Sequence, residues 1–397
     1  MNPAAKLRNV YGSVPDHRDQ GWDGVPITKN SYESQYCHSN GKWLAIAVHS
    51  QGGGAFVVFP MKFHGRVDER YPRFVGHTRP VYDLRWSNFR DNIIASASED
   101  ASIKLWDVPE EGLTADCKSY ITNFTAHKKK CVKVEWHPSA NDTLISCAYD
   151  KAVIVWNCEK GKAFKTTMLD DSVYDVSWYF DGSLAAATTK NKTLYILDPR
   201  AAKTNDSVVA HAGAKCMKVV WLGKTPYICT TGFSRTSERQ VSVWDQRNLA
   251  EGPVHLEIID SGPGALYPFY DQDLSILYIA GKGDANIRYY ELRNSPPHLI
   301  GLNQYSSNNP QRAVGYMNKR HVATGKCEIF RFFKLHANGN YVEPLSMIVP
   351  RRPDSGFQDD LYPPTNGPAP AMSVSDYEEG GNKPPTQASF EAGEEPE

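Results

Sequence analysis

Short runs in which hydrophobic and polar residues alternate recur along the chain, and they predict β-strands. The second, fourth and sixth residues are apolar in "VYDLRW" (81–86), "CVKVEW" (131–136), "VYDVSW" (173–178) and "CMKVVW" (216–221). A period of two turns every second side chain toward the same face of a strand. We therefore expect a half-buried strand in each of these four runs.

A second set of runs ends in a large residue that is followed by an acid or an asparagine. These runs are "SIKLW" (102–106), "AVIVW" (152–156), "TLYIL" (193–197), "QVSVW" (240–244) and "NIRYY" (286–290). Their last residues are 50, 41, 47 and 46 positions apart, and a strand of small residues precedes each run. Several strands in each repeating unit of this length, ending in Trp-Asp, are typical of WD-repeat β-propeller blades.

Two further regions complete the predicted ring of blades. Residues 31–75, with "WLAIAV" and "AFVVFP", fit one more blade, and residues 301–349, with "CEIFRFFKL", fit another. The segment "LRNVY" (7–11) is expected to pair with the last blade and so remove a free sheet edge. The sequence therefore predicts an all-β protein whose residues 1–350 form a seven-bladed WD-repeat β-propeller.

Three histidines occupy the position that the repeat gives to its histidine: His77, His127 and His211. Buried polar side chains in such a unit are expected to satisfy one another by hydrogen bonds. We expect a structural network inside the blades that joins these histidines to Asp100, Trp106, Asp150, Trp156 and Trp244. Catalysis is the alternative role, and the repeat spacing favours the structural one.

The composition is typical of a globular protein, with 41% hydrophobic and 22% charged residues. No apolar run approaches the roughly 18 residues of a membrane span, and the N-terminus lacks the apolar core of a secretory signal. The eight cysteines include no CxxC pair, which favours reduced core residues over disulfides or zinc ligands. We therefore expect a cytoplasmic protein that is not transmembrane.

Charge is unevenly distributed, although the net charge is only −1. The last 25 residues, from Ser373 onward, hold seven acids and one lysine, so they carry −6 and the preceding 372 carry about +5. A basic excess modestly favours an anionic partner. The run "KKK" (128–130) is either a solvated loop or a docking patch, and no feature indicates nucleic-acid binding.

The sequence lacks motifs for catalysis or cofactor binding. "GKGDAN" (281–286) lacks the strand–loop–helix context of a phosphate-binding loop, and "SQGGGAF" (50–56) lacks the dinucleotide-binding pattern. No G-x-S-x-G nucleophile motif occurs. We predict no catalytic residue, no metal and no cofactor, and hence no enzyme; the alternative is an enzyme that uses the central channel of the propeller.

An insertion distinguishes the fifth predicted blade. Two or three residues join the small-residue strand to the next strand in blades two to four, whereas seven, Phe233 to Arg239, do so in blade five. The polar sequence "GFSRTSERQ" is consistent with a phosphate or substrate site and with the tip of a hairpin. We interpret it as a hairpin on the rim or face of the propeller.

Several segments are similar to the coronin family, and the match runs from about Lys6 to Thr365. The specific ones are "GFSRTSERQ", "GKGDANIRYYE" and "FQDDLYPPT", supported by "GHTRPVYDLRW" and "CEIFRFFKLH". The resemblance implies binding to F-actin, regulation of the actin cytoskeleton at the cell cortex, and an extension over 351–366 that packs on the propeller. It also favours a structural role for the insertion. A WD-repeat scaffold for another cytosolic complex is the alternative function.

The resemblance further implies an essential basic residue just before the first blade, in the segment matching "ITKNSYESQYC". Lys29 holds that position, where animal members carry arginine; lysine keeps the charge but loses the bidentate fork. A solvated loop lysine is the alternative reading. Weaker candidates for actin binding are Arg66, Arg70, Arg73, Lys6 and Arg8. Anionic phosphoinositides suit the same basic loops.

The C-terminal region departs from the family pattern, in which a linker and a coiled coil oligomerise the protein and help it engage the actin-nucleating complex. Residues 351–397 contain eight prolines and no heptad run, so they form no coiled coil. We expect a monomeric chain that lacks the coil by truncation or by nature. Low hydrophobicity and acidity predict a disordered Pro-rich acidic tail over 367–397.

Overall fold

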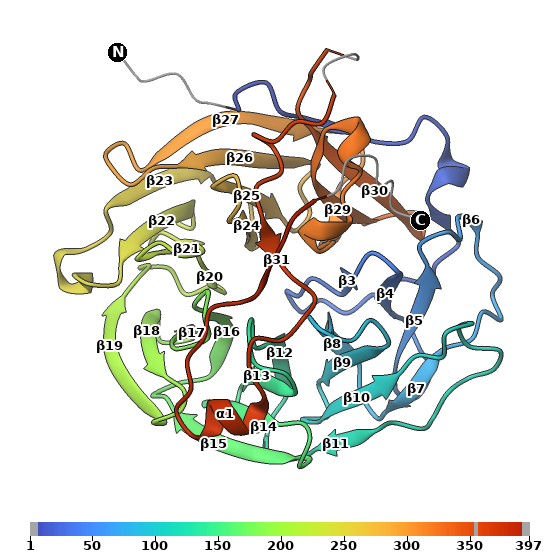
Figure 1. The fold of residues 1–397 in the computed structure, drawn as a ribbon, viewed down its shortest axis with the longest axis horizontal. Helices are drawn as coiled ribbons and strands as arrows, with labels where there is room; N and C mark the ends of the chain where they lie inside the picture. The colour runs from blue at the N-terminus through green and yellow to red at the C-terminus, as the bar shows by residue number, and fades with distance from the viewer. Residues whose placement is uncertain (1–6, 353–355, 391–397) are drawn as a thin grey trace.

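Seven antiparallel sheets surround a central channel in the computed structural model, which describes residues 7–352 and 356–390 (Figure 1). Each sheet is one blade, with its first strand along the channel and its last strand at the rim. The prediction of a seven-bladed β-propeller is confirmed.

Blades one to three each take four strands in chain order, although β6 (Gly65–Arg66), which lies between the third and fourth strands of blade one, joins another blade. Blade one comprises β3 (Cys37–Ser39), β4 (Trp43–Val48), β5 (Gly54–Pro60) and β7 (Phe74–His77). Blade two comprises β8 (Val81–Trp86), β9 (Ile93–Ser98), β10 (Ile103–Asp107) and β11 (Thr122–Phe124). Blade three comprises β12 (Cys131–Trp136), β13 (Thr143–Ala148), β14 (Ala152–Asn157) and β15 (Lys162–Met168).

Blades four to six follow the same plan. Blade four comprises β16 (Val173–Trp178), β17 (Ala185–Thr189), β18 (Thr193–Asp198) and β19 (Lys203–Val209). Blade five comprises β20 (Lys218–Trp221), β21 (Tyr227–Phe233), β22 (Arg239–Asp245) and β23 (His255–Asp260), with the 3-10 turn η2 (Leu249–Glu251) before β23. Blade six comprises β24 (Leu266–Asp271), β25 (Ile276–Gly281), β26 (Asn286–Leu292) and β27 (Leu299–Ser306).

The N-terminal segment completes the seventh blade. Three of its strands are β28 (Gln311–Tyr316), β29 (Glu328–His336) and β30 (Tyr341–Ile348), with the 3-10 turns η3 (Lys319–His321) and η4 (Thr324–Lys326) before β29. The outer strand consists of β1 (Tyr11–Ser13) and β2 (Trp22–Asp23), separated by η1 (Arg18–Gln20). β6 (Gly65–Arg66) adds to β2 in parallel at the rim.

This closure occurs a few residues later than the expected segment 7–11. Tyr11 pairs with Ile348 and Ser13 with Ser346, whereas Leu7 to Val10 form a turn in which the Val10 amide donates to the Leu7 carbonyl. Because Val10 is fully buried, the turn anchors the closing strand against the ring.

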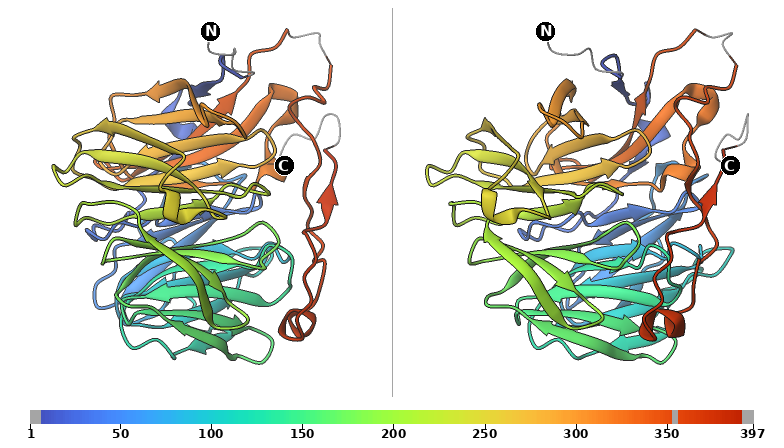
Figure 2. Two further views of the ribbon diagram at one scale, coloured as in Figure 1. Left: turned by 90° about the vertical axis from the view of Figure 1, so that its left-hand side faces the viewer. Right: turned by 60° about the vertical axis from the view of Figure 1, so that its left-hand side comes forward.

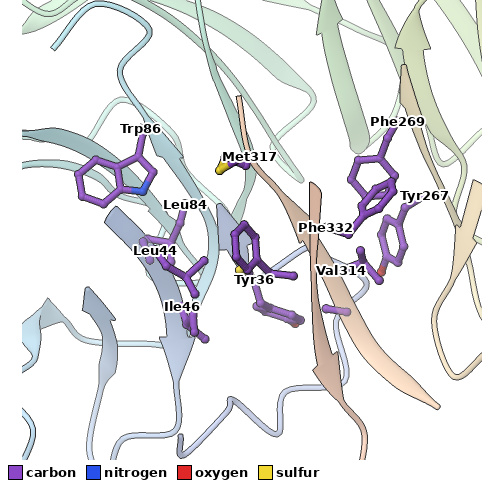
Figure 3. Packing of buried hydrophobic residues seen from close by; sticks show 14 of the residues in the cluster. Tyr36, Leu44, Ile46, Leu84, Trp86, Tyr267, Phe269, Val314, Met317 and Phe332 are labelled. Carbon is purple, nitrogen blue, oxygen red and sulfur yellow. The ribbon is translucent and has the colours of Figure 1, made fainter. Parts of the chain in front are cut away.

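Apolar side chains fill the space between neighbouring blades. Figure 3 shows Leu44 and Ile46 of β4 near Leu84 of β8, all three fully buried. Between blades six and seven, the rings of Phe269 and Phe332 meet edge to face with centroids 5.3 Å apart (Figure 3). Burial of aromatic and branched side chains is the main favourable term in folding. The alternating runs in the sequence therefore supply the contacts that hold the blades together.

In three of the four alternating runs, the final tryptophan joins its blade to the preceding one. The indole N–H of Trp86 donates to the His38 carbonyl at 3.0 Å, and that of Trp136 donates to the Arg85 carbonyl at 2.9 Å. The indole N–H of Trp178 likewise donates to the Glu135 carbonyl at 3.3 Å. Each indole thus contributes apolar area and satisfies a buried backbone oxygen on a neighbouring inner strand.

A hydrogen-bonded chain of four side chains runs through blade two. The Trp106 indole donates to Ser96 Oγ at 2.8 Å, Ser96 Oγ lies 2.7 Å from His77 Nε2, and His77 Nδ1 lies 2.9 Å from Asp100 Oδ2. Because the ionised carboxylate can only accept, Nδ1 carries the proton and donates to it, and Nε2 of the neutral ring accepts from the serine hydroxyl. Burial lowers the pKa of His77, which keeps the ring neutral.

The same arrangement recurs in two other blades. In blade three the chain is Trp156, Ser146, His127 and Asp150, with distances of 2.8, 2.7 and 3.0 Å. In blade five it is Trp244, Thr230, His211 and Gln240, with distances of 2.9, 2.9 and 3.1 Å. The repeat spacing singled out the tryptophans and histidines, whereas the hydroxyl between them was missed because small residues fill the whole strand.

The two faces of the ring differ in what covers them. Antiparallel strands place their connections alternately at the two ends of a blade. The first-to-second and third-to-fourth connections form the face that residues 362–390 cross, which we call the extension face (Figures 1 and 2). The second-to-third turns and the connections between blades form the opposite face, which we call the open face.

The extension consists of regular elements. β31 (Thr365–Asn366) pairs with β32 (Gln387–Ala388) across the channel, and α1 (Val374–Glu378) lies over blade three between them (Figure 1). Tyr377 is 1% exposed; its ring meets that of His137 at 4.7 Å, and the Arg200 guanidinium lies 5.2 Å from its centroid.

Polar contacts fix the same helix to blade three. The Glu378 carboxylate accepts from Asn157 at 2.7 Å and from Lys160 at 2.8 Å. The structure thus corrects the expectation of a disordered tail for residues 367–390, while 391–397 lie outside the described residues. Low hydrophobicity suggested disorder, but three apolar side chains, Met372, Val374 and Tyr377, are enough to bury against the propeller.

Replacing Ser96 by alanine should destabilise the propeller by about 2 kcal/mol, because the Trp106 N–H and His77 Nε2 lose a shared partner. Urea unfolding monitored by tryptophan fluorescence measures the loss. The exposed Ser207→Ala is the control and should change nothing. Trp106→Phe should lower the free energy of unfolding less in the Ser96→Ala background than in the wild type. Equal losses in the two backgrounds would contradict the hydrogen-bonded chain.

Replacing Tyr377 by alanine should release the extension from the propeller, because it removes a buried ring worth about 3 kcal/mol. Amide hydrogen exchange should accelerate throughout residues 367–388 and stay unchanged in the blade strands. The exposed Ser375→Ala on the same helix is the matched control. Unchanged exchange in Tyr377→Ala would show that the ring does not hold the extension.

Candidate functional site

The open face carries more exposed basic side chains than acidic ones. Among the described residues in its connections, eight lysines and arginines are exposed: Lys29, Arg79, Lys128, Lys129, Lys151, Lys190, Lys215 and Arg235. The only exposed carboxylate there is Asp170. Since these cations lie in separate turns of the sequence, only the fold brings them onto one face.

Internal partners occupy several carboxylates of this face. His77 and Ser102 hold Asp100, His127 holds Asp150, and both aspartates have side chains only 9% exposed. Burial raises the pKa of Asp100, but the hydrogen bonds from His77 and Ser102 lower it more, so the net shift is downward. Both carboxylates keep their charge, but they are withdrawn from solvent and accept hydrogen bonds from within the blade, whereas the cations of this face are exposed.

The segment that leads from the closing strand into blade one crosses the open face. Ile27 forms a β-bridge with Val48, and the His49 amide donates to the Pro26 carbonyl at 2.8 Å. Lys29 follows directly and is exposed. Its neighbour Thr28 lines a surface hollow together with Arg79 of the next blade connection. Lys29 therefore stands among the basic residues of this face.

The other basic residues suggested by the sequence lie elsewhere. Arg66 is exposed in β6 at the outer rim, and Arg70 and Arg73 lie in the connection that follows. Arg73 is held locally: its amide donates to Asp116 at 2.9 Å and its guanidinium to the Glu69 carbonyl. Arg8 is exposed beside the closing strand, and Lys6 lies outside the described residues. Proximity to Lys29 in the sequence therefore did not predict which basic residues lie on the open face, whereas blade topology determines it.

Charged side chains on the inner strands form hydrogen bonds between neighbouring blades. A cavity of about 250 Å³ lies in the channel between Gln35 at one end and Asn366 of the extension at the other. Asp83 and Asp175 each accept a backbone N–H of the following blade, from Val134 and Val219, both at 3.1 Å. Among the described residues, no group of three or more His, Cys, Asp or Glu able to hold a metal ion occurs.

The insertion in blade five is a hairpin closed by its own polar side chains. β21 and β22 extend to Phe233 and Arg239, which leaves a five-residue tip. Ser234 Oγ and Thr236 Oγ1 donate to the Glu238 carboxylate at 3.1 and 2.9 Å, and the Glu238 amide donates back to Ser234 Oγ. These contacts indicate a hairpin tip stabilised by its own side chains.

Arg239, at the base of this hairpin, joins blade five to blade six. Its side chain is 3% exposed and forms a bidentate pair with Asp260 at 2.6 and 2.7 Å and a second pair with Asp284 at 3.0 Å. Arg288 also contacts Asp260 at 3.0 Å. The hydrogen bond from Arg239 lowers the pKa of Asp260 to about 2. Two segments that look unrelated in the sequence, "GFSRTSERQ" and "GKGDANIRYYE", therefore meet in one partly buried cluster of ion pairs, which we call the Arg239 joint.

The closed ring of seven blades with its Trp–Ser–His–Asp chains defines a WD-repeat β-propeller. Residues 69–107 and 118–157 match the WD domain, G-beta repeat; residues 342–385 match a type of WD40 repeat; and residues 1–66 match a domain of unknown function. Among the described residues, no helix is long and apolar enough to span a bilayer.

Comparison of whole chains identifies the family. The chain is 39% identical to human Coronin-2A over 398 residues, which cover 99% of this chain and 75% of that protein. It is 41% identical to human Coronin-2B over 396 residues, covering 98% and 81%. The structure matches the WD40 domain of Toxoplasma gondii coronin with a TM-score of 0.91 at 32% identity over 98% of both chains. The protein belongs to the coronin family.

Replacing Arg239 by methionine should destabilise the protein by about 3 kcal/mol at neutral pH, because two partly buried carboxylates lose their shared cation. The pKa of Asp260 is lowered in the folded state, so its stabilising contribution is complete above about pH 4 and disappears as the pH falls toward 2. The difference in Tm between the wild type and Arg239→Met should therefore decrease between pH 4 and pH 2.

A double variant provides the control for the Arg239 joint. Adding Asp260→Asn to Arg239→Met should restore part of the lost stability, because it removes one uncompensated charge. A difference in Tm that stays constant down to pH 2 would contradict this role of the Arg239 joint. So would a double variant that is no more stable than Arg239→Met.

Proposed function

We propose that this protein binds actin filaments through the open face of its propeller and thereby organises the actin cytoskeleton. Membership of the coronin family supports the choice of partner. The observation that carries the proposal is the concentration of eight exposed cations on the face that the extension leaves uncovered. Lys29 lies within that group, as a contact with an acidic filament requires.

Electrostatics gives this interface its expected behaviour. Actin filaments are acidic, so a basic face accelerates encounter and orients the propeller before short-range contacts form. Exposed lysines make single-point contacts that salt screens over about 10 Å at 0.1 M ionic strength. Filament binding should therefore weaken steadily as salt concentration rises.

The same cations suit the phosphate headgroups of phosphoinositides, which would place the protein at the cell cortex. Both partners are anionic surfaces, so competition between them is expected on a single face. Filaments remain the favoured partner because the exposed cations spread over several blade connections, a wide array that matches an extended protein surface.

Co-sedimentation with actin filaments across a salt series tests the proposal. The wild type should pellet at low salt and lose affinity as salt rises. Lys29→Glu and the pair Lys128→Glu/Lys129→Glu should each weaken binding about tenfold or more, because they place negative charge on the binding face. Lys203→Glu, an exposed lysine on the rim strand β19, is the matched control and should bind like the wild type.

Two outcomes would redirect the proposal. If the chain stays in the supernatant, fusion to a neutral trimerising coil supplies avidity; if the fused protein also fails to pellet, actin is abandoned in favour of a scaffold for another complex. If the wild type pellets and all three charge variants bind equally well, the filament contacts another surface. Vesicles with and without phosphoinositide, tested with the same variants, determine whether lipid uses the same face.

A further inference from the structure

The residues that follow Lys29 close the channel at the open face. Tyr32 stacks on Tyr82 with centroids 4.5 Å apart and 26° between the rings, and it meets Tyr149 edge-on at 6.1 Å. The Lys130 ammonium lies 4.0 Å from the Tyr149 centroid and 4.9 Å from that of Tyr32. A lysine within about 6 Å of several ring faces is held by cation–π attraction, which is stronger where solvent is excluded.

Hydrogen bonds from other blades hold the backbone of the same segment. Lys218 of blade five donates to the Glu33 carbonyl at 2.8 Å, and Lys282 of blade six donates to the Ser31 carbonyl. The Ser34 hydroxyl donates to the Tyr82 carbonyl of blade two. Residues 31–34 are thus fixed from blades on several sides of the channel.

Lys29 lies between two anchors. On one side the Thr28 amide donates to the Ala47 carbonyl at 3.2 Å, and on the other side the chain enters the tyrosine cluster at Tyr32. Lys130 differs from its neighbours Lys128 and Lys129, which are exposed, because its charge is partly buried against the rings. Burial lowers the pKa of Lys130, in agreement with an ammonium directed into the protein.

We propose that Lys130, with Tyr32, Tyr82 and Tyr149, is a positioning device that fixes the backbone of Lys29 for contact with the acidic partner. This inference rests on the proposed function, which it deepens by assigning a role to one lysine of the run 128–130. A loop held in its binding conformation before the encounter loses less entropy on association. Lys130 therefore acts through Lys29, whereas Lys128 and Lys129 act by direct attraction.

A double-mutant cycle in filament co-sedimentation at low salt separates these roles. Lys130→Met keeps the side-chain length but removes the cation, and it should raise the Kd about fivefold in the wild-type background. In a Lys29→Ala background it should leave the Kd unchanged. Lys129→Met is the matched control and should raise the Kd by the same factor in both backgrounds. Lys130→Arg, which keeps the cation, should bind like the wild type.

Amide hydrogen exchange without actin provides a second measurement. Residues 28–36 should exchange about fivefold faster in Lys130→Met, at the wild-type rate in Lys130→Arg, and at the wild-type rate in Lys129→Met. Thermal unfolding of each variant shows whether the propeller itself remains folded.

The outcomes distinguish the failure of this inference from the failure of the proposed function. If the wild type pellets but Lys130→Met raises the Kd equally with and without Lys29, Lys130 contacts the partner directly and the positioning role is wrong. Unchanged exchange in residues 28–36 of Lys130→Met overturns it as well. If neither the wild type nor its fusion to a trimerising coil pellets, the proposed function and this role in binding are overturned together.

Discussion

Pairing of the N-terminal strands β1 and β2 with β30 is the constraint on which the rest of the structure depends. Each blade buries its two apolar faces only against its neighbours, so an open ring would expose two faces and a long sheet edge. The same closure determines where the chain goes next. After β2 the chain must cross from the seventh blade to the first, and this crossing carries Lys29 over the open face and Tyr32 into the channel mouth.

Closure also explains why the two faces differ. The last strand of the propeller ends at the extension face, so the residues after Val349 lie there, and the N-terminal crossing lies on the opposite side (Figure 2). One end of the channel is therefore covered by β31 and the other by Tyr32. The cavity between them is lined by charged residues whose partners lie on adjacent inner strands, which favours a structural channel.

The sequence predicts the blades well because a single local pattern encodes each one. Alternation and a terminal tryptophan mark each inner strand of blades two to five, and the same residues make the contacts between blades. The candidate binding face is different: Arg79, Lys151, Lys190 and Lys215 stand alone in the sequence and meet only through blade topology. Ordering of residues 367–390 was missed for a related reason, since composition does not reveal that Tyr377 packs against His137 and is buried there.

The hydrogen-bonded chains of blades two and three have a consequence for the surface. Each begins at a buried indole and ends at a carboxylate on the open face, so the imidazole that stabilises the blade also holds that carboxylate away from solvent. Arg239 has the same double effect on Asp260 and Asp284. A substitution at these positions therefore changes the stability of the fold and the electrostatic potential of the open face together. Substituting the buried His77 or Arg239 would change both the stability of the propeller and the environment of carboxylates on this face.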